Sequence, residues 1–118
     1  MSTPTETTAY KILSDQEMEQ LEHDGEFAGA PVDLADGYIH LSTASQLQGT
    51  LDKHFAGRAD LWIAAVDLEA LGDAVKWEVS RGGELFPHIY ATLPLSVVTA
   101  YSPLHRNADG SVALPVAG

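Results

Sequence analysis

The 118-residue chain contains no cysteine and few basic residues, 6 Lys and Arg against 17 Asp and Glu, for a net charge of −11. Without cysteine it forms no disulfide, thiolate nucleophile or Cys-ligated zinc site. So few cations disfavour binding to phosphate backbones and to anionic membrane surfaces. We therefore expect a small-molecule ligand and neither a nucleic acid nor a membrane as partner, although one or two local cations could still bind a small anion.

Long apolar runs and several well-known motifs are also missing. No apolar stretch approaches the roughly 20 residues that span a bilayer. The N-terminus has neither the basic flank nor the apolar core of a signal peptide, so we expect a cytoplasmic protein. The sequence has no Gly-x-Ser-x-Gly elbow, Gly-x-Gly-x-x-Gly fingerprint or P-loop, which disfavours a serine hydrolase, a Rossmann site and a Walker site.

The first third of the chain predicts one strand and one helix. Residues 9–13 are typical of a short strand. Ser14 and Glu17 have the spacing of a capping box, and Gly25 is suited to the left-handed end of the helix that follows. The Gly-, Pro- and Asp-rich residues 26–36 predict a loop.

A second strand and a second helix follow. Residues 38–41 are expected to form the strand, and residues 43–46 have the pattern of a second capping box. The helix after it carries apolar residues at every fourth position and is expected to end at Gly57.

The second half is rich in strand patterns. Residues 61–66 are continuously apolar, as in a central strand buried on both faces. Residues 75–79 alternate apolar and polar side chains, and residues 82–83 are two glycines that predict a hairpin. Residues 85–92 and 95–101 supply the last two strands. Helices early and strands late indicate an α+β domain over residues 9–103, with a disordered tail at 1–8 and a loose tail at 104–118.

The strand-to-helix junction at residues 36–46 contains the first candidate site residues. If Ile39 and Leu41 face the core, His40 faces the opposite side, toward any open cleft. Ser42 and Thr43 follow at a helix N-terminus, where unpaired N–H groups suit a phosphate or carboxylate. Alternatively, Thr43 only caps the helix and His40 makes one structural hydrogen bond.

Glu78 is the second candidate. It points away from the Trp77 face of its strand, so burial of Trp77 directs Glu78 into solvent or into a pocket. A partly desolvated carboxylate can bind a sugar hydroxyl or stabilise a developing positive charge. It could equally be a solvated side chain that pairs with Lys76, which stabilises little.

Residues 86–90 form the third candidate segment. Strand alternation places Phe86, His88 and Tyr90 on one face, where aromatic rings could stack on a planar base. The same rings could form a wall of the core, which we favour for Phe86. Pro87 denies the sheet one backbone donor and suggests an edge or a bulge.

A metal site deserves consideration because the chain has five histidines. His40, His88 and Glu78 could provide the two-His, one-carboxylate set of a catalytic metal. No pair of histidines has the helical spacing His-x-x-x-His, so the sequence predicts no metal, and a metal-dependent hydrolase is the least favoured alternative.

Four motifs in order give the chain a resemblance to a known family, covering residues 9 to about 103. They are Tyr10-Lys11-Ile12, Asp36-Gly37-Tyr38-Ile39-His40-Leu41-Ser42-Thr43, Trp77-Glu78 and Phe86-Pro87-His88-Ile89-Tyr90. Their order resembles the uncharacterised bacterial domain-of-unknown-function 952 family. The resemblance implies the ADP-ribosyltransferase-like fold, a split two-sheet α+β domain, here with two helices in its N-terminal half. Active members of that fold hold NAD in a central cleft.

A weaker resemblance concerns residues 38–42, which are similar to the Val-His-Leu-Ser segment of the RNA 2′-phosphotransferases. It implies that His40 takes the second motif position of the cleft. Lys11 would then stand where active members carry His or Arg against NAD. The third position falls on Glu78 or on residues 88–90, and the sequence leaves that choice open.

These observations predict an ADP-ribosyltransferase-like protein with a cleft for NAD or a nucleotide. His40, Glu78 and His88 are the candidate catalytic residues, and the candidate cofactor-binding residues are Lys11, Ser42, Thr43 and Tyr90. Any enzyme of this type would be an NAD-dependent ADP-ribosyl- or phosphotransferase, but a non-catalytic binding module fits the same residues. The sequence does not decide between the two, nor does it indicate an oligomeric state.

Overall fold

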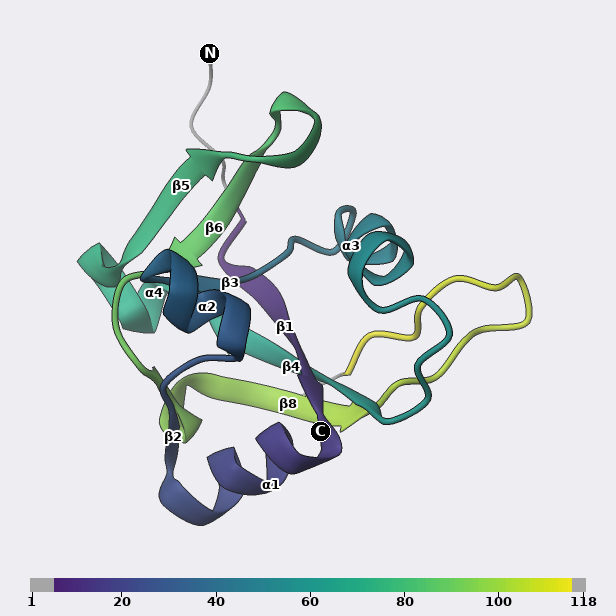
Figure 1. Cartoon of the computed structure of the whole chain (residues 1–118), viewed down its shortest axis with the longest axis horizontal. Helices are drawn as coiled ribbons and strands as arrows, with labels where there is room; N and C mark the ends of the chain where they lie inside the picture. The colour runs from purple at the N-terminus through teal and green to yellow at the C-terminus, as the bar shows by residue number, and fades with distance from the viewer. Residues whose placement is uncertain (1–5, 116–118) are drawn as a thin grey trace.

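The computed structural model describes residues 6–115, and its largest sheet has three antiparallel strands. The central strand β4 (Leu61–Asp67) lies between β1 (Thr8–Ser14) and β8 (Val98–Pro103). The central position explains why β4 is apolar along nearly its whole length, because both of its edges are paired and side chains cover both faces. Figure 1 shows this sheet crossing the lower half of the molecule.

A second three-stranded sheet carries the candidate site. Its central strand β6 (Leu85–Ile89) pairs antiparallel with β3 (Ile39–His40) and with β5 (Val75–Val79). The two glycines after β5 make the predicted hairpin to β6, within the short helical turn η2 (Arg81–Gly83). A bridge between Tyr10 of β1 and Ser42 joins this sheet to the first one.

Smaller elements connect the two sheets. The strands β2 (Glu26–Phe27) and β7 (Leu93–Pro94) form a two-stranded ribbon. The helices are α1 (Asp15–Asp24), α2 (Pro31–Asp36), α3 (Leu47–His54) and α4 (Leu68–Leu71), and the further 3-10 turns are η1 (Gly72–Ala74) and η3 (Leu95–Val97). The molecule is thus a mixed α+β protein with several sheets.

Helix α1 forms as its sequence predicts. Ser14 accepts a hydrogen bond from the Glu17 amide at 3.1 Å, and the Glu17 carboxylate accepts one from the Ser14 amide at 2.8 Å. Gly25 ends the helix with φ of 77°, a left-handed conformation that favours glycine. Met18 and Leu21 are buried against the sheet, so apolar burial holds this helix in place.

Strand β1 is buried on both faces. Ala9 and Leu13 belong to the main core, which also contains Met18 and Leu21 of α1. Ile12 faces the other side and packs with residues of α3 and β4. Lys11 shares the side of Ala9 and Leu13 because of the alternation along the strand, and it is therefore buried, with 5% of its surface exposed.

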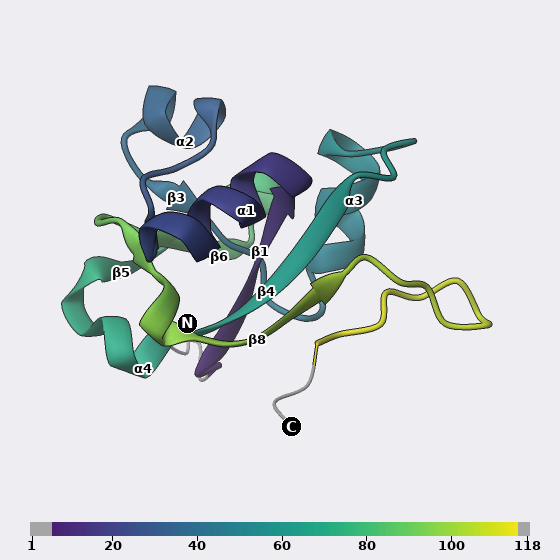
Figure 2. The same cartoon turned by 90° about the horizontal axis from the view of Figure 1, so that it is seen from below.

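The expected loop at residues 26–36 is the main correction to the sequence analysis. It contains β2 and the helix α2, so the described part of the first half has three helices rather than two. Pro31 stands at the start of α2 and Gly37 ends it in the left-handed conformation, with φ of 88°. Figure 2 shows α2 projecting from the body of the molecule above β3.

Two further boundaries differ from the prediction. Residues 44–46 form a turn, so α3 begins at Leu47, and it ends at His54 rather than at Gly57. The Gln46 side chain still accepts a hydrogen bond from the Thr43 amide at 3.0 Å, which is half of the expected capping box.

The chain termini were expected to be tails. Residues 1–5 and 116–118 lie outside the described part of the chain, and Thr8 already belongs to β1. Residues 104–115 are joined by an antiparallel bridge between Arg106 and Val112, and the Leu104 amide donates one hydrogen bond to the Leu61 carbonyl of β4 at 2.9 Å. Within the described residues no helix is long and apolar enough to cross a membrane.

Candidate functional site

The two candidate segments meet on neighbouring strands. His40 of β3 stands directly opposite His88 of β6, and their ring centroids are 5.3 Å apart. Ile39 and Leu41 are buried in the core, so His40 faces the other side, as the alternation predicts. The pairing of β3 with β6 therefore brings together residues that are almost fifty positions apart in the sequence.

Tyr38 and Tyr90 complete a group of four rings around this pair, which we call the aromatic cluster: Tyr38, His40, His88 and Tyr90. Tyr38 stacks on His88 with centroids 4.2 Å apart and an angle of 21° between the rings. It lies 4.8 Å from the ring of His40 and 5.2 Å from that of Tyr90. His88 is buried beneath this stack, whereas 45% of Tyr90 is exposed.

Glu78 of β5 joins the cluster through two hydrogen bonds. Its Oε1 accepts a bond from Nδ1 of His88 and another from the hydroxyl of Tyr90, each of 2.8 Å. The bonds from His88 and Tyr90, and the charges of His88 and Lys76, lower the pKa of Glu78. The bond to Glu78 and partial desolvation raise the pKa of Tyr90 to about 12. Glu78, His88 and Tyr90 thus form one hydrogen-bonded unit.

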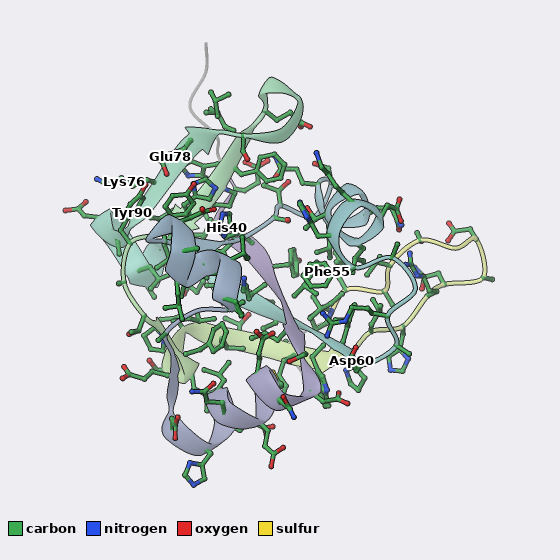
Figure 3. The ribbon with its side chains drawn as sticks, viewed as in Figure 1. His40, Phe55, Asp60, Lys76, Glu78 and Tyr90 are labelled. Carbon is green, nitrogen blue, oxygen red and sulfur yellow. The ribbon has the colours of Figure 1, made fainter. Side chains whose placement is uncertain are left out.

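Figure 3 shows this arrangement. His40, Glu78 and Tyr90 lie on the β3–β6–β5 side of the molecule, with Lys76 beside them. Phe55 and Asp60 lie on the other side, near α3 and the start of β4. His40, Glu78 and Tyr90 are therefore grouped on one side of the molecule.

Asp33 of α2 anchors the other side of His40. Its side chain is fully buried, and its Oδ2 accepts hydrogen bonds from Lys11 Nζ at 2.9 Å and from the Ala30 amide at 2.8 Å. Its Oδ1 accepts bonds from the His40 amide at 3.1 Å and from His40 Nδ1 at 2.6 Å. Burial alone raises the pKa of Asp33, but the bonds from His40, Lys11 and Ala30 and the charge of Lys11 together lower it to about 2.

The backbone at Gly29 makes room for this carboxylate. Gly29 has φ of 131°, a conformation that other residues rarely adopt, and a Cβ added there would lie 2.8 Å from Cβ of Asp33. Glycine thus allows Asp33 to approach the turn before α2 closely enough to bond the Ala30 amide.

Asp36, at the end of α2, faces the second ring nitrogen of His40. The distance between His40 Nε2 and Asp36 Oδ2 is 3.0 Å. Carboxylate oxygens only accept hydrogen bonds, so each ring nitrogen of His40 faces an acceptor. His40, with 31% of its side chain exposed, is thereby oriented by a carboxylate on each side.

A cleft of about 350 Å³ opens beside the aromatic cluster, between α2 and the end of β6. Tyr38 and Tyr90 form part of its wall, together with Asp33, Leu34 and Thr92. Its volume is within the range of small-molecule sites. This combination of concavity, aromatic rings and ionised groups makes it the candidate binding site.

Three predicted cofactor-binding residues do not line the cleft. Ser42 is buried and its hydroxyl is bonded to Thr50 of α3 at 2.8 Å. Thr43 is also buried, and its hydroxyl lies 3.3 Å from that of Ser45. Lys11 is buried against Asp33, so it contributes to the site by fixing Asp33 rather than by facing a ligand.

The alternative of a metal centre gains no geometric support. Among residues 6–115 no group of three His, Asp or Glu side chains is arranged to hold a metal ion. Nδ1 of His88 is engaged by Glu78, and both nitrogens of His40 face the carboxylates of α2.

The sequence analysis missed Asp33, Asp36 and Tyr38 as site residues. Asp33 and Asp36 lay in the expected loop, and Tyr38 was assigned to a strand without a role. The helix start could have been found from Pro31 with Asp33 two residues later and Gly37 after the helix. No local pattern indicates that Lys11 and His40 would be the partners of Asp33.

Comparison with known proteins now identifies the family. The model of the family described as protein of unknown function, DUF952, matches residues 12–101. The chain belongs to this family. None of the curated proteins matches it significantly.

Solved structures of one relative resemble the DUF952 fold described here. The crystal structure of protein CC0527 from Caulobacter crescentus is 48% identical, with a TM-score of 0.82 over 91% of this chain and 94% of that chain. The solution NMR structure of CC0527 is 49% identical, with a TM-score of 0.77 over 90% and 91% of the two chains. The likeness thus extends over nearly the whole of both proteins.

Proposed function

We propose that this DUF952 protein has the ADP-ribosyltransferase-like fold and binds NAD or a nucleotide in the cleft beside the aromatic cluster. The observation that carries the proposal is the pairing of His40 with His88, which gathers four rings and the ionised Glu78 into one cluster, whose Tyr38 and Tyr90 line the cleft. Rings at a concave site favour a planar ligand, and a carboxylate beside them favours sugar hydroxyls.

The residues fit one end of NAD better than the other. Tyr38 and Tyr90 offer aromatic surface for a nicotinamide or adenine ring, and Glu78 offers acceptors for ribose hydroxyls. Of the described residues that line the cleft, none is Lys, Arg or His, the side chains that hold a diphosphate. The proposal therefore concerns the base and ribose end.

Bound NAD would supply an N-glycosidic bond whose cleavage develops positive charge on the ribose. Glu78 has a lowered pKa and is ionised near neutral pH, so its carboxylate can stabilise such a charge. His88 and Tyr90 hold that carboxylate in one orientation. Asp33 and Asp36 hold the ring of His40, which remains partly exposed for contact with a ligand.

Isothermal titration with NAD, ADP-ribose and nicotinamide tests the proposal. We expect NAD to bind and His40→Ala to weaken binding at least tenfold, because the variant removes a ring of the cluster. His105→Ala is the matched control, since His105 is exposed and does not line the cleft. Absence of heat with all three compounds in the wild-type protein would contradict the proposal.

A non-catalytic binding module is the second candidate function. It is favoured by the fact that Glu78 already accepts two hydrogen bonds within the protein. Both candidates predict binding and a rise in melting temperature with NAD. Only the enzyme releases free nicotinamide, which chromatography of the reaction mixture would detect and which Glu78→Gln should abolish.

A further inference from the structure

The chemistry of the cleft specifies the charge of its ligand. The wall contains aromatic rings, one carboxylate and the hydroxyl of Thr92. Thr92 donates a hydrogen bond to the carboxylate of Glu26 at 3.2 Å, which places a further negative charge near the cleft. The described residues of the wall thus offer ring faces and a hydroxyl but no cationic side chain, and their one carboxylate, that of Asp33, is fully buried and ion-paired with Lys11.

Carboxylates also lie around Tyr38, at the junction of the cleft and the aromatic cluster. Partial desolvation raises the pKa of Tyr38, and the negative charges of Asp36 and Glu78 raise it further. These two residues come from different elements, α2 and β5, so the fold itself brings their charges to the same ring. About 45% of the side chain of Asp36 and 41% of that of Glu78 are exposed.

The nearest lysines, Lys11 and Lys76, both lie outside the cleft wall. Lys11 is buried and ion-paired with Asp33 at 2.9 Å. Lys76 stands on β5 opposite His88, and its charge acts on Glu78 from outside the cleft wall. A ligand in the cleft therefore meets no ammonium or guanidinium group among the described residues of the wall.

We infer that the cleft selects a ligand group that carries a positive charge: a pyridinium ring or an alkylated ammonium. Aromatic faces attract cations, and the carboxylates of Asp36 and Glu78, whose charges act on Tyr38 in the wall, add to that attraction. The inference rests on the proposed function for the location of the site and goes beyond it by assigning the charge of the recognised group. According to this inference, the phosphates of a nucleotide do not bind in the cleft.

Two pairs of compounds that differ in charge test this inference by isothermal titration, and the second pair is also equal in shape. One pair is the ring-methylated cation of nicotinamide and neutral nicotinamide. The other is choline and its uncharged analogue, in which carbon replaces the quaternary nitrogen. We expect the cation of at least one pair to bind roughly tenfold more tightly than its neutral partner.

The variant Glu78→Gln should reduce that preference for the cation, since it removes a charge and keeps the shape. Glu22→Gln is the matched control because Glu22 also accepts a bond from a tyrosine hydroxyl, that of Tyr101 at 3.0 Å, far from the cleft. Melting temperatures of both variants check that the fold is retained. Asp36→Asn provides a second variant if Glu78→Gln does not fold.

The outcomes separate this inference from the proposed function. Binding of the cations without binding of NAD would overturn the proposed function and support the inference. Binding of NAD would support the proposed function, and if the cation and the neutral compound of both pairs then bound with equal affinity, the inference would be overturned. Displacement of a bound cation by inorganic phosphate or ADP-ribose would also overturn the inference, and no binding of any compound would overturn both.

Discussion

Helices α1 and α2 are held to the molecule by opposite means. In α1 the apolar side chains of Met18 and Leu21 are buried, and a capping box closes its first turn. In α2 the only buried residue is Asp33, while Val32 and Leu34 are 57% and 64% exposed. One helix is thus held by apolar burial and the other by a single carboxylate that bonds Lys11 and His40.

This difference has a functional meaning. A helix held by apolar contacts, such as α1, is part of the core. Its position tolerates changes in the charge of its exposed side chains. A helix held by one ionised side chain places that side chain where it can orient His40 and line the cleft. A helix with a single buried residue, Asp33, thus shapes the candidate site.

The largest expected effect is on the attachment of α2. Asp33→Asn removes the countercharge of the buried Lys11, and breaking a buried pair in this way costs about 3–5 kcal/mol of unfolding free energy. Urea unfolding measures the change. Asp36→Asn, on the same helix but exposed, should cost no more than about 1 kcal/mol. Equal effects of the two variants would show that α2 is not held by Asp33.

The next largest effect concerns how the unfolding free energy depends on pH. The folded pKa of Asp33, about 2, lies below its usual value of 3.8, so its contribution is present above pH 4 and is lost as pH falls through 2. A shift of this size corresponds to about 2 kcal/mol. The difference in unfolding free energy between wild type and Asp33→Asn should therefore shrink from pH 5 to pH 2.5. A constant difference over that interval would contradict the low pKa.

The smallest effect concerns α1. Ser14→Ala removes the side-chain acceptor of the capping box and should cost about 1 kcal/mol of unfolding free energy. We expect ligand binding in the cleft to be unchanged, because α1 contributes no residue to the cleft wall. Thermal unfolding and titration of the same variant check both statements. A loss of binding would show that the two helices are not as independent as their packing indicates.

The sequence analysis performed well where local patterns determine structure. The capping box, the stop at Gly25, the central position of β4 and the hairpin after β5 were all predicted. The opposite orientation of His40 and Ile39 followed from alternation along a strand. The analysis failed at α2, whose start lacks the Ser, Thr or Asn cap that usually marks a helix, and whose exposed apolar residues form no amphipathic pattern.

What the sequence alone determined is the acidity, the α+β class, the family resemblance and the identity of His40, Glu78, His88 and Tyr90 as candidate residues. These depend on composition and on neighbours within a few positions. Only the tertiary structure decided that Asp33 bonds both Lys11 and His40, and that Glu78 bonds both His88 and Tyr90. The physical reason is that a buried carboxylate takes whichever donors the packing of sheets and helices brings within about 3 Å, and sequence separation carries no record of that distance.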